Sequence, residues 1–173
     1  MSVARKLIVI PEAPSRIEGA VRIDASYPRM YTEAEMRQWA VDTERLLNTP
    51  PAAIERLRTM GRDRLTPEER VVARVYDEYF VDPSRGIKGS LRDDGVVELD
   101  GGRHRAAYLI ERGVDVPVWV STPDQGRLDA YANRCARDRA AREAGRGGDA
   151  RIEESRRPLD REKRHERPEG RTR

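Results

Sequence analysis

The sequence predicts an α+β fold, a small mixed β-sheet with packed helices, followed by a charged C-terminal tail. Three observations predict it. Short apolar runs at residues 6–10 and 116–120 are typical of buried strands, and residues 87–99 alternate around a glycine-containing turn, as in a hairpin. Residues 32–80 repeat apolar side chains at helical spacing. After residue 144 large apolar residues nearly disappear.

These patterns divide the chain into two parts. We expect one domain at residues 1–144, with an enlarged helical region at about 32–80. Residues 142–173 hold 11 basic and 8 acidic residues, and so little apolar surface cannot offset the entropy of ordering the chain. We therefore expect a disordered charged tail, or a frayed helix, at residues 145–173.

The N-terminal strand at residues 6–10 ends at Pro11. Pro11, Pro14 and Gly19 then indicate a loop. Residues 20–24 alternate apolar and polar side chains, which predicts a second short strand.

Helix starts are marked by capping boxes. Thr32 with Glu35, and Thr66 with Glu69, are spaced so that the hydroxyl accepts an early helix N–H while the carboxylate reaches back to the cap. Prolines 50 and 51 end the first helix, and a shorter helix is expected at residues 52–60. The apolar faces are expected to be Met36, Trp39, Ala40, Thr43, Leu46 and Leu47 in the first helix, and Val72, Val75, Tyr76 and Tyr79 in the last.

A hairpin is predicted from two strands, residues 87–92 and 96–99, joined at Asp93-Asp94-Gly95. A helix should follow at residues 103–112, with Ala106, Ala107 and Ile110 facing inward, Tyr108 packed, and Gly113 as its left-handed stop.

The next strand, residues 116–120, contains Pro117, which predicts an edge position or an irregular start. Thr122 and Gln125 have the spacing of a third capping box, for a helix extending to about Ala144. Its apolar face is expected to be Leu128, Tyr131, Ala132 and Cys135.

Composition excludes several classes of protein. One cysteine, Cys135, allows neither an internal disulfide framework nor a cysteine-cluster zinc site, and two histidines exclude a histidine-rich metal site. No apolar run approaches a membrane span, so we expect no membrane partner and a cytoplasmic protein. The formal net charge is only +3, although 31 of the 34 basic residues are arginines.

One stretch carries chemistry, the turn from Gly101 to Arg105 between a strand and a helix. Glycine lets the backbone approach a ligand closely, and the first N–H groups of a helix attract anions, most often phosphate. Arg103, His104 and Arg105 put cationic groups in the first turn, where they oppose the helix dipole unless an anion lies nearby. The alternative is a structural turn whose arginines pair with acidic residues.

The sequence Gly-Gly-Arg-His-Arg at residues 101–105, followed by Ala-Ala-Tyr and by the strand Val-Pro-Val-Trp-Val, resembles the ParB/sulfiredoxin superfamily. The resemblance covers about residues 87–120. It implies that Gly101 and Gly102 form a turn for nucleotide phosphates, that His104 and Arg105 contact phosphate oxygens, and that Arg103 takes the variable position. The implied ligand is a nucleoside triphosphate, CTP or ATP, with or without Mg²⁺.

Departures from the family limit what the resemblance implies. Arg103 stands where sulfiredoxins carry their nucleophilic cysteine, which argues against sulfinic-acid reduction. The helix-turn-helix reader and dimerisation segment of ParB proteins have no counterpart after residue 120. Kinases that belong to the same superfamily need a carboxylate base. Here Glu98 and Asp100 are the candidates for that base, and Asp24 is a further one.

We therefore expect a nucleotide-phosphate-binding ParB-like module that acts in DNA-associated processes such as plasmid or mobile-element maintenance. Two alternatives stay open: an ATP-dependent phosphotransferase or nucleotide hydrolase of the same fold, and a ligand-free interaction domain. Nonspecific nucleic acid is a candidate partner of the arginine-rich tail, and a homodimer is also compatible with the sequence.

Overall fold

The computed structural model describes residues 3–23 and 31–155, with side chains as far as residue 146. Contacts divide the chain into two units, residues 1–138 and residues 139–173. The elements, in chain order, are β1 (Ala4–Ile10), α1 (Ala13–Arg16), β2 (Ile17–Glu18), α2 (Glu33–Leu47), α3 (Pro51–Thr59), the 3₁₀ helix η1 (Arg62–Arg64), α4 (Pro67–Val75), the π-helix η2 (Tyr76–Val81), β3 (Lys88–Leu91), β4 (Val97–Gly101), α5 (Arg103–Glu111), β5 (Val116–Thr122) and α6 (Gln125–Ser155).

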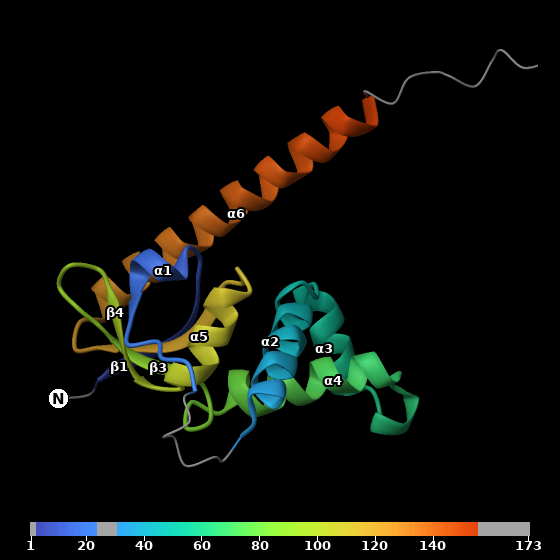
Figure 1. The fold of residues 1–173 in the computed structure, drawn as a ribbon, viewed down its shortest axis with the longest axis horizontal. Coiled ribbons are helices and arrows are strands. Elements are labelled where there is room, and N and C mark those ends of the chain that lie inside the picture. Colours follow the sequence, from blue (N-terminus) through green and yellow to red (C-terminus); the bar gives the residue numbers. More distant parts are fainter. Residues whose placement is uncertain (1–2, 24–30, 156–173) are drawn as a thin grey trace, which may run out of the picture. The chain divides into compact units, whose positions relative to one another are not determined.

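The five strands form one mixed sheet, which confirms the predicted α+β class. Their order is β1-β5-β3-β4-β2; the pairs β1/β5 and β3/β4 are antiparallel, whereas β5/β3 and β4/β2 are parallel. Helix α5 packs between the sheet and α2 (Figure 1).

Two apolar clusters hold the first unit together. The larger cluster joins the sheet to α2, α5 and the start of α6, and centres on Ile10, Val97, Leu109, Val118 and Leu128. The smaller one lies among α2, α3 and α4 and consists of Leu46, Leu57, Leu65, Val72 and Val75. Tyr79 of η2 packs against both clusters. Most residues of the expected stripes therefore belong to these clusters, and Tyr108, 2% exposed, packs as expected. Leu47 and Ala107 are only partly buried and belong to neither cluster, whereas Leu109, which the expected stripe of α5 left out, is fully buried.

Strand β5 is an interior strand, so the predicted edge position of Pro117 is wrong. The N–H of Trp119 donates to the carbonyl of Ile87 at 2.8 Å, and N–H groups two residues apart point to the same side of a strand. The missing N–H of Pro117 therefore faces the side of β3, where pairing begins only at Trp119. The proline costs no ladder hydrogen bond.

The predicted strand at residues 20–24 is also wrong for its described part, residues 20–23; Asp24 lies outside the described residues. The chain instead forms α1 and β2 earlier, within the expected loop, and turns at Gly19 with a φ of 89°. The backbone of Val21 is already engaged, because its N–H donates to the carbonyl of Arg103 and its own carbonyl bonds the ring of His104. It has no groups left for a strand ladder.

Both predicted capping boxes of the helical region are present, at Thr32 with Glu35 and at Thr66 with Glu69. The third is wrong. Thr122 is the last residue of β5, paired with Ala4 and buried, and the backbone N–H of Arg127 bonds the Asp124 carboxylate at 3.1 Å instead.

Helix α6 continues eleven residues past its expected end at Ala144. An ion pair four residues apart, between Arg139 and Glu143, and several alanines favour its propagation. The rest of the predicted tail, residues 156–173, lies outside the described residues. Across the part of the chain that is described, no helix combines the length and the apolar composition that a membrane crossing demands.

Candidate functional site: a cationic cavity at the start of helix α5

The Gly101–Arg105 motif forms the junction between β4 and α5. Gly102 is the N-cap of α5, with a φ of 73°, and a Cβ there would lie 2.9 Å from the Cα of Ile87. Only glycine meets both conditions without strain. The first bond of the helix runs from the N–H of Ala106 to the carbonyl of Gly102, so the preceding amides lie outside the helical ladder. No side chain caps this end.

A cavity of about 690 Å³ opens at this junction. It is walled by the motif, by η2, by the segment before β3, by α2 and by the residues on either side of the undescribed stretch 24–30. Its lining residues are Ile23, Tyr31, Met36, Glu78, Tyr79, Ser84, Arg85, Gly101, Gly102, Arg103, His104 and Arg105. All five predicted binding residues therefore line one cavity.

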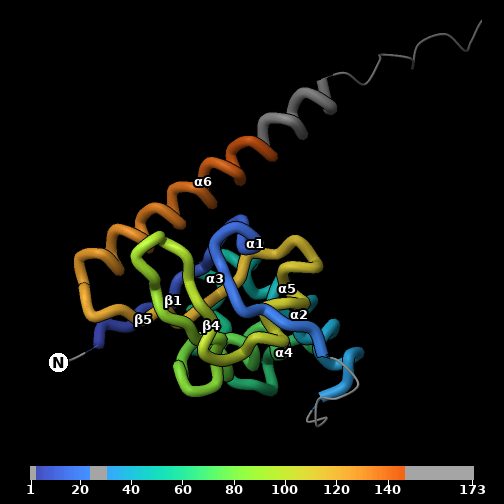
Figure 2. The backbone as a smooth tube through the Cα atoms, turned by 60° about the vertical axis from the view of Figure 1, so that its left-hand side comes forward, coloured from blue at the N-terminus to red at the C-terminus, as the bar shows by residue number. Residues whose placement is uncertain are grey.

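Two side chains of the motif are held by a backbone segment, residues 19–23, that runs beside the start of α5 (Figure 2). The Nε of Arg103 donates to the carbonyl of Gly19 at 2.5 Å, and the Nδ1 of His104 lies 2.6 Å from the carbonyl of Val21. Because a carbonyl only accepts, Nδ1 carries a proton. The neutral acceptor at Gly19 positions Arg103 and leaves its charge in place.

Arg105 is held by aromatic rings. Its guanidinium carbon lies 4.7 Å from the ring centre of Tyr79 and 5.5 Å from that of Trp39, and its Nη2 donates to the carbonyl of Gly86 at 3.3 Å. Burial lowers the pKa of Arg105 from its ordinary value, although arginine stays protonated in folded proteins. The guanidinium is thus a cation partly stripped of water, and it gains from an anionic ligand.

The charges around the cavity are unbalanced. Among the described residues, neither Arg103 nor Arg105 forms an ion pair, and Arg85 reaches only Asp82, at 3.9 Å. Glu78 is the one acidic residue in the described lining. A helix start favours negative charge, yet the first turn of α5 contains no acidic residue. Both the side chains and the helix end therefore attract an anion to the same place.

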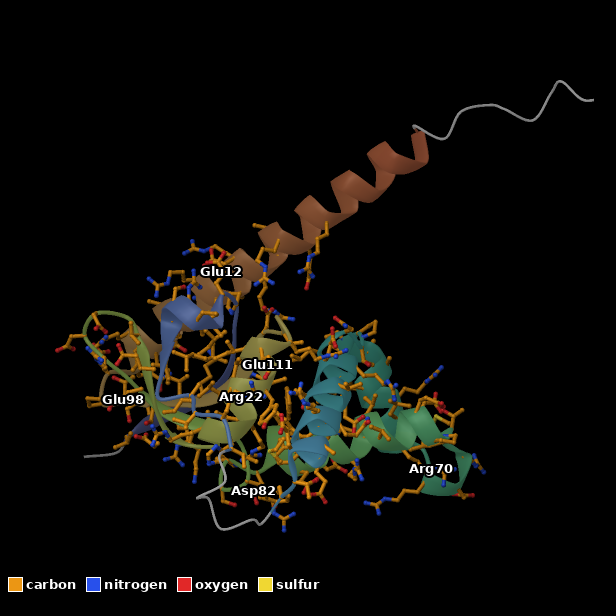
Figure 3. The ribbon with its side chains drawn as sticks, viewed as in Figure 1. Glu12, Arg22, Arg70, Asp82, Glu98 and Glu111 are labelled. Carbon is orange, nitrogen blue, oxygen red and sulfur yellow. The ribbon has the colours of Figure 1, made fainter. Side chains whose placement is uncertain are left out.

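The two predicted catalytic carboxylates, Glu98 and Asp100, are not in the cavity. Side chains alternate along β4, so that Val97 and Leu99 face the core while Glu98 and Asp100 are exposed on the other face of the sheet. There Asp100 accepts from the hydroxyl of Ser90 at 2.9 Å. Figure 3 shows Glu98 at the sheet, well apart from Asp82. Asp82 lies just before the cavity residues Ser84 and Arg85 in the chain.

Four polar lining residues escaped the sequence analysis: Tyr31, Glu78, Ser84 and Arg85. Glu78 had one usable signal, since it directly precedes Tyr79 on a helix whose tyrosines were expected to pack. Nothing local marks Tyr31 or Arg85, because the tertiary fold alone brings them to α5.

The described residues offer no protein-held metal site: nowhere among them do three or more histidine, cysteine, aspartate or glutamate side chains gather to hold an ion. Any Mg²⁺ in the cavity would therefore be held chiefly by ligand phosphates.

Comparisons with known proteins do not extend this description. No protein-family model matches the chain, and neither the curated proteins nor the solved structures include a match. The resemblance to the ParB/sulfiredoxin superfamily therefore stays a prediction, and the chemistry of the cavity carries the functional argument.

Proposed function

We propose that the chain binds a nucleoside triphosphate in the cavity at the start of α5, with the phosphates against Gly102, His104 and Arg105. The observation that carries this proposal is the pair of arginines beside an uncapped helix start: among the described residues, Arg103 and Arg105 are held by backbone carbonyls and aromatic rings and form no ion pair. Surface arginines normally pair with acidic residues, and 31 acidic residues are present in this chain.

Phosphate is the anion that suits this geometry best. Arginine presents a planar fork of donors that matches phosphate oxygens, and helix N–H groups add donors pointing the same way. Since one nitrogen of each arginine already bonds a carbonyl, the forks are positioned before the ligand arrives. Less side-chain freedom is then lost on binding.

The rest of the cavity favours a nucleotide over bare phosphate. Its volume of about 690 Å³ lies within the range of small-molecule sites, about 300–1,000 Å³. Besides the cationic groups, the lining contains Tyr31, Tyr79, Met36 and Ile23. Such aromatic and apolar surface suits a base, and the Tyr31 residue is 52% exposed.

Calorimetric titration with ATP, CTP, GTP and inorganic triphosphate tests the proposal, using the intact chain and its Arg105→Met variant. Methionine keeps the apolar stem between the rings but removes the charge. We expect Arg105→Met to weaken nucleotide binding by about 1.5–3 kcal/mol, or roughly 10- to 100-fold. Arg70→Met, on an exposed arginine of α4 that does not line the cavity, is the matched control. Normal binding by Arg105→Met, or no binding by folded protein, would contradict the proposal.

Phosphoryl transfer or hydrolysis receives less support than binding. Either reaction needs a carboxylate within reach of the reacting group, and Glu98 and Asp100 lie on the other face of the sheet. Binding without turnover is therefore the expected result. Production of ADP or CDP that Glu78→Gln abolishes would instead favour the enzymatic alternative.

The resemblance also implies a role in DNA-associated processes. Because the tail is rich in arginine, we propose that any nonspecific DNA binding uses the tail. Deleting residues 146–173 should lower the affinity for random duplex DNA and flatten its salt dependence, because fewer phosphates would be neutralised. The measurement is fluorescence anisotropy at several salt concentrations. Unchanged affinity and slope would remove the tail from the proposal.

A further inference from the structure

One wall of the cavity is the π-helix η2, which is held on two sides. Its Tyr76 and Phe80 stack with ring centres 5.8 Å apart and pack on the smaller apolar cluster. The carbonyl of Tyr79 accepts from the indole N–H of Trp119 at 3.0 Å. Single π-turns in helices are frequent at functional sites. Here the turn presents Glu78 and Tyr79 to the cavity from a fixed backbone.

Glu78 is an acidic residue among cations with which it does not pair. No described lysine, arginine or histidine nitrogen lies within 4.0 Å of its carboxylate, although Arg85, Arg103 and Arg105 share the same cavity. Burial first, and then the charge of Glu78, raise the pKa of the Tyr79 hydroxyl. The same charge also acts on Arg105.

A carboxylate can only accept hydrogen bonds, and so can a fully ionised phosphate. Glu78 therefore repels the phosphates that the arginines attract, and a ligand suits both only if it carries hydrogen-bond donors close to its phosphates. In a nucleotide the groups next to the phosphates are the ribose hydroxyls. Two neighbouring hydroxyls match the two oxygens of one carboxylate, and a carboxylate is a known partner of the ribose 2′-hydroxyl in other nucleotide sites.

Building on the proposed nucleotide site, we infer that Glu78 accepts hydrogen bonds from the ribose hydroxyls, so that the cavity selects ribonucleotides over deoxyribonucleotides. In this orientation the phosphates lie at Arg105, the sugar lies at η2, and the base lies toward Tyr31. Glu78 is then the residue that determines sugar specificity, whereas the α5 turn supplies affinity for any triphosphate.

The test is a set of calorimetric titrations with ATP and CTP, their 2′-deoxy and 3′-deoxy analogues, and inorganic triphosphate. The proteins are the intact chain, Glu78→Gln and the control Asp77→Asn, which removes a negative charge from the same turn outside the cavity. We expect the intact chain and Asp77→Asn to bind ribonucleotides at least about 10-fold more tightly than 2′-deoxynucleotides, the range for a hydrogen bond to a charged group. In Glu78→Gln this ratio should fall below about three, while triphosphate binds as well as before or better.

The outcomes separate the inference from the proposal on which it rests. Equal affinity of the intact chain for ribo- and deoxynucleotides, or a ratio that survives Glu78→Gln, would overturn the role of Glu78 and leave the phosphate site standing. An equal gain for every ligand in Glu78→Gln would make Glu78 a charge-balancing residue only, which also overturns it. If even triphosphate fails to bind folded protein, the proposed function fails and the inference fails with it.

Discussion

The N-termini of α2 and α5 solve the same problem in opposite ways. At α2 the side chain of Thr32 accepts from the N–H of Glu35, the Glu35 carboxylate bonds the N–H of Thr32 in return, and two acidic residues lie in the first turn. At α5 a glycine leaves the end uncapped, and the first turn holds two arginines and a histidine. The first arrangement satisfies the helix internally. The second leaves the helix start without a side-chain cap and without an acidic residue in its first turn.

This contrast is what the proposed phosphate site at α5 requires. A helix end without a cap is less stable by roughly 0.5–2 kcal/mol than a capped one, and cations beside it add to that cost. In the same chain α2 and α4 have complete capping boxes, whereas α5 has none. Local conflict of this kind is expected where function takes precedence.

The largest expected loss of stability comes from placing a side chain on Gly102 at the start of α5. Gly102→Ala should lower the free energy of unfolding by about 2–4 kcal/mol, because alanine meets both the left-handed backbone and the backbone of Ile87. Gly101→Ala is the matched control. Its Cβ would meet only the flexible end of Lys88, so its cost should stay below about 1 kcal/mol. Urea denaturation measures both, and similar losses would show that the junction is not strained.

An added anion should stabilise the start of α5, as the capping box stabilises the start of α2. A saturating phosphate ligand stabilises the folded protein by mass action, by about 2.7 kcal/mol at one hundred times its Kd. Thermal unfolding with inorganic triphosphate, against sodium chloride at the same ionic strength, measures the shift in Tm. We expect the shift in the intact chain but not in Arg105→Met. An equal shift in both would mean that the anion acts elsewhere.

Removing a cap should cost less than straining the junction. Thr32→Ala and Thr66→Ala should each lower the free energy of unfolding by about 1 kcal/mol, since each leaves a helix N–H without its acceptor. Neither residue lines the cavity, so nucleotide affinity should not change. Titration and urea denaturation of the same samples check both statements. Loss of binding in either variant would couple the caps to the site.

The smallest expected effect is a pH dependence confined to the capped helix. The Thr32 N–H, and then its hydroxyl, hold the pKa of Glu35 below its ordinary value of 4.5. A lowered folded-state pKa gives stability that is complete above the ordinary value and is lost as the pH falls through the lowered one. The stability difference between the intact chain and Glu35→Gln should therefore shrink between pH 6 and pH 3. A stability difference that stays constant over this range would contradict the prediction.

Features encoded over a few neighbouring residues could be predicted from the sequence. The capping boxes of α2 and α4, the hairpin of β3 and β4, and the glycine turn before α5 all depend on residues close together in the chain. Two strand or cap signals failed because a tertiary partner had taken the groups involved. Val21 gives its backbone to Arg103 and His104, and Thr122 is still part of β5.

The site divides along the same line. Residues 101–105 are contiguous, so sequence spacing was enough to mark them, and they line one cavity. The acidic residue of that cavity could not be predicted in the same way. Glu98 and Asp100 are the catalytic candidates because they lie just before the motif in the sequence, but strand alternation turns them to the other face of the sheet. Glu78 lies far from the motif in the sequence, and the tertiary fold brings it to the cavity.

The aromatic setting of Arg105 has a consequence for spectroscopy. The chain has two tryptophans, and both contact the wall behind the cavity: the ring of Trp39 lies edge-on to Tyr79 at 5.4 Å and beside Arg105, while the indole N–H of Trp119 bonds the Tyr79 carbonyl. Indole emission responds to nearby charge and hydrogen bonding. A ligand that neutralises Arg105 thus changes the surroundings of Trp39 without touching it, and the intrinsic fluorescence of the protein becomes a built-in reporter of whether the cavity is filled.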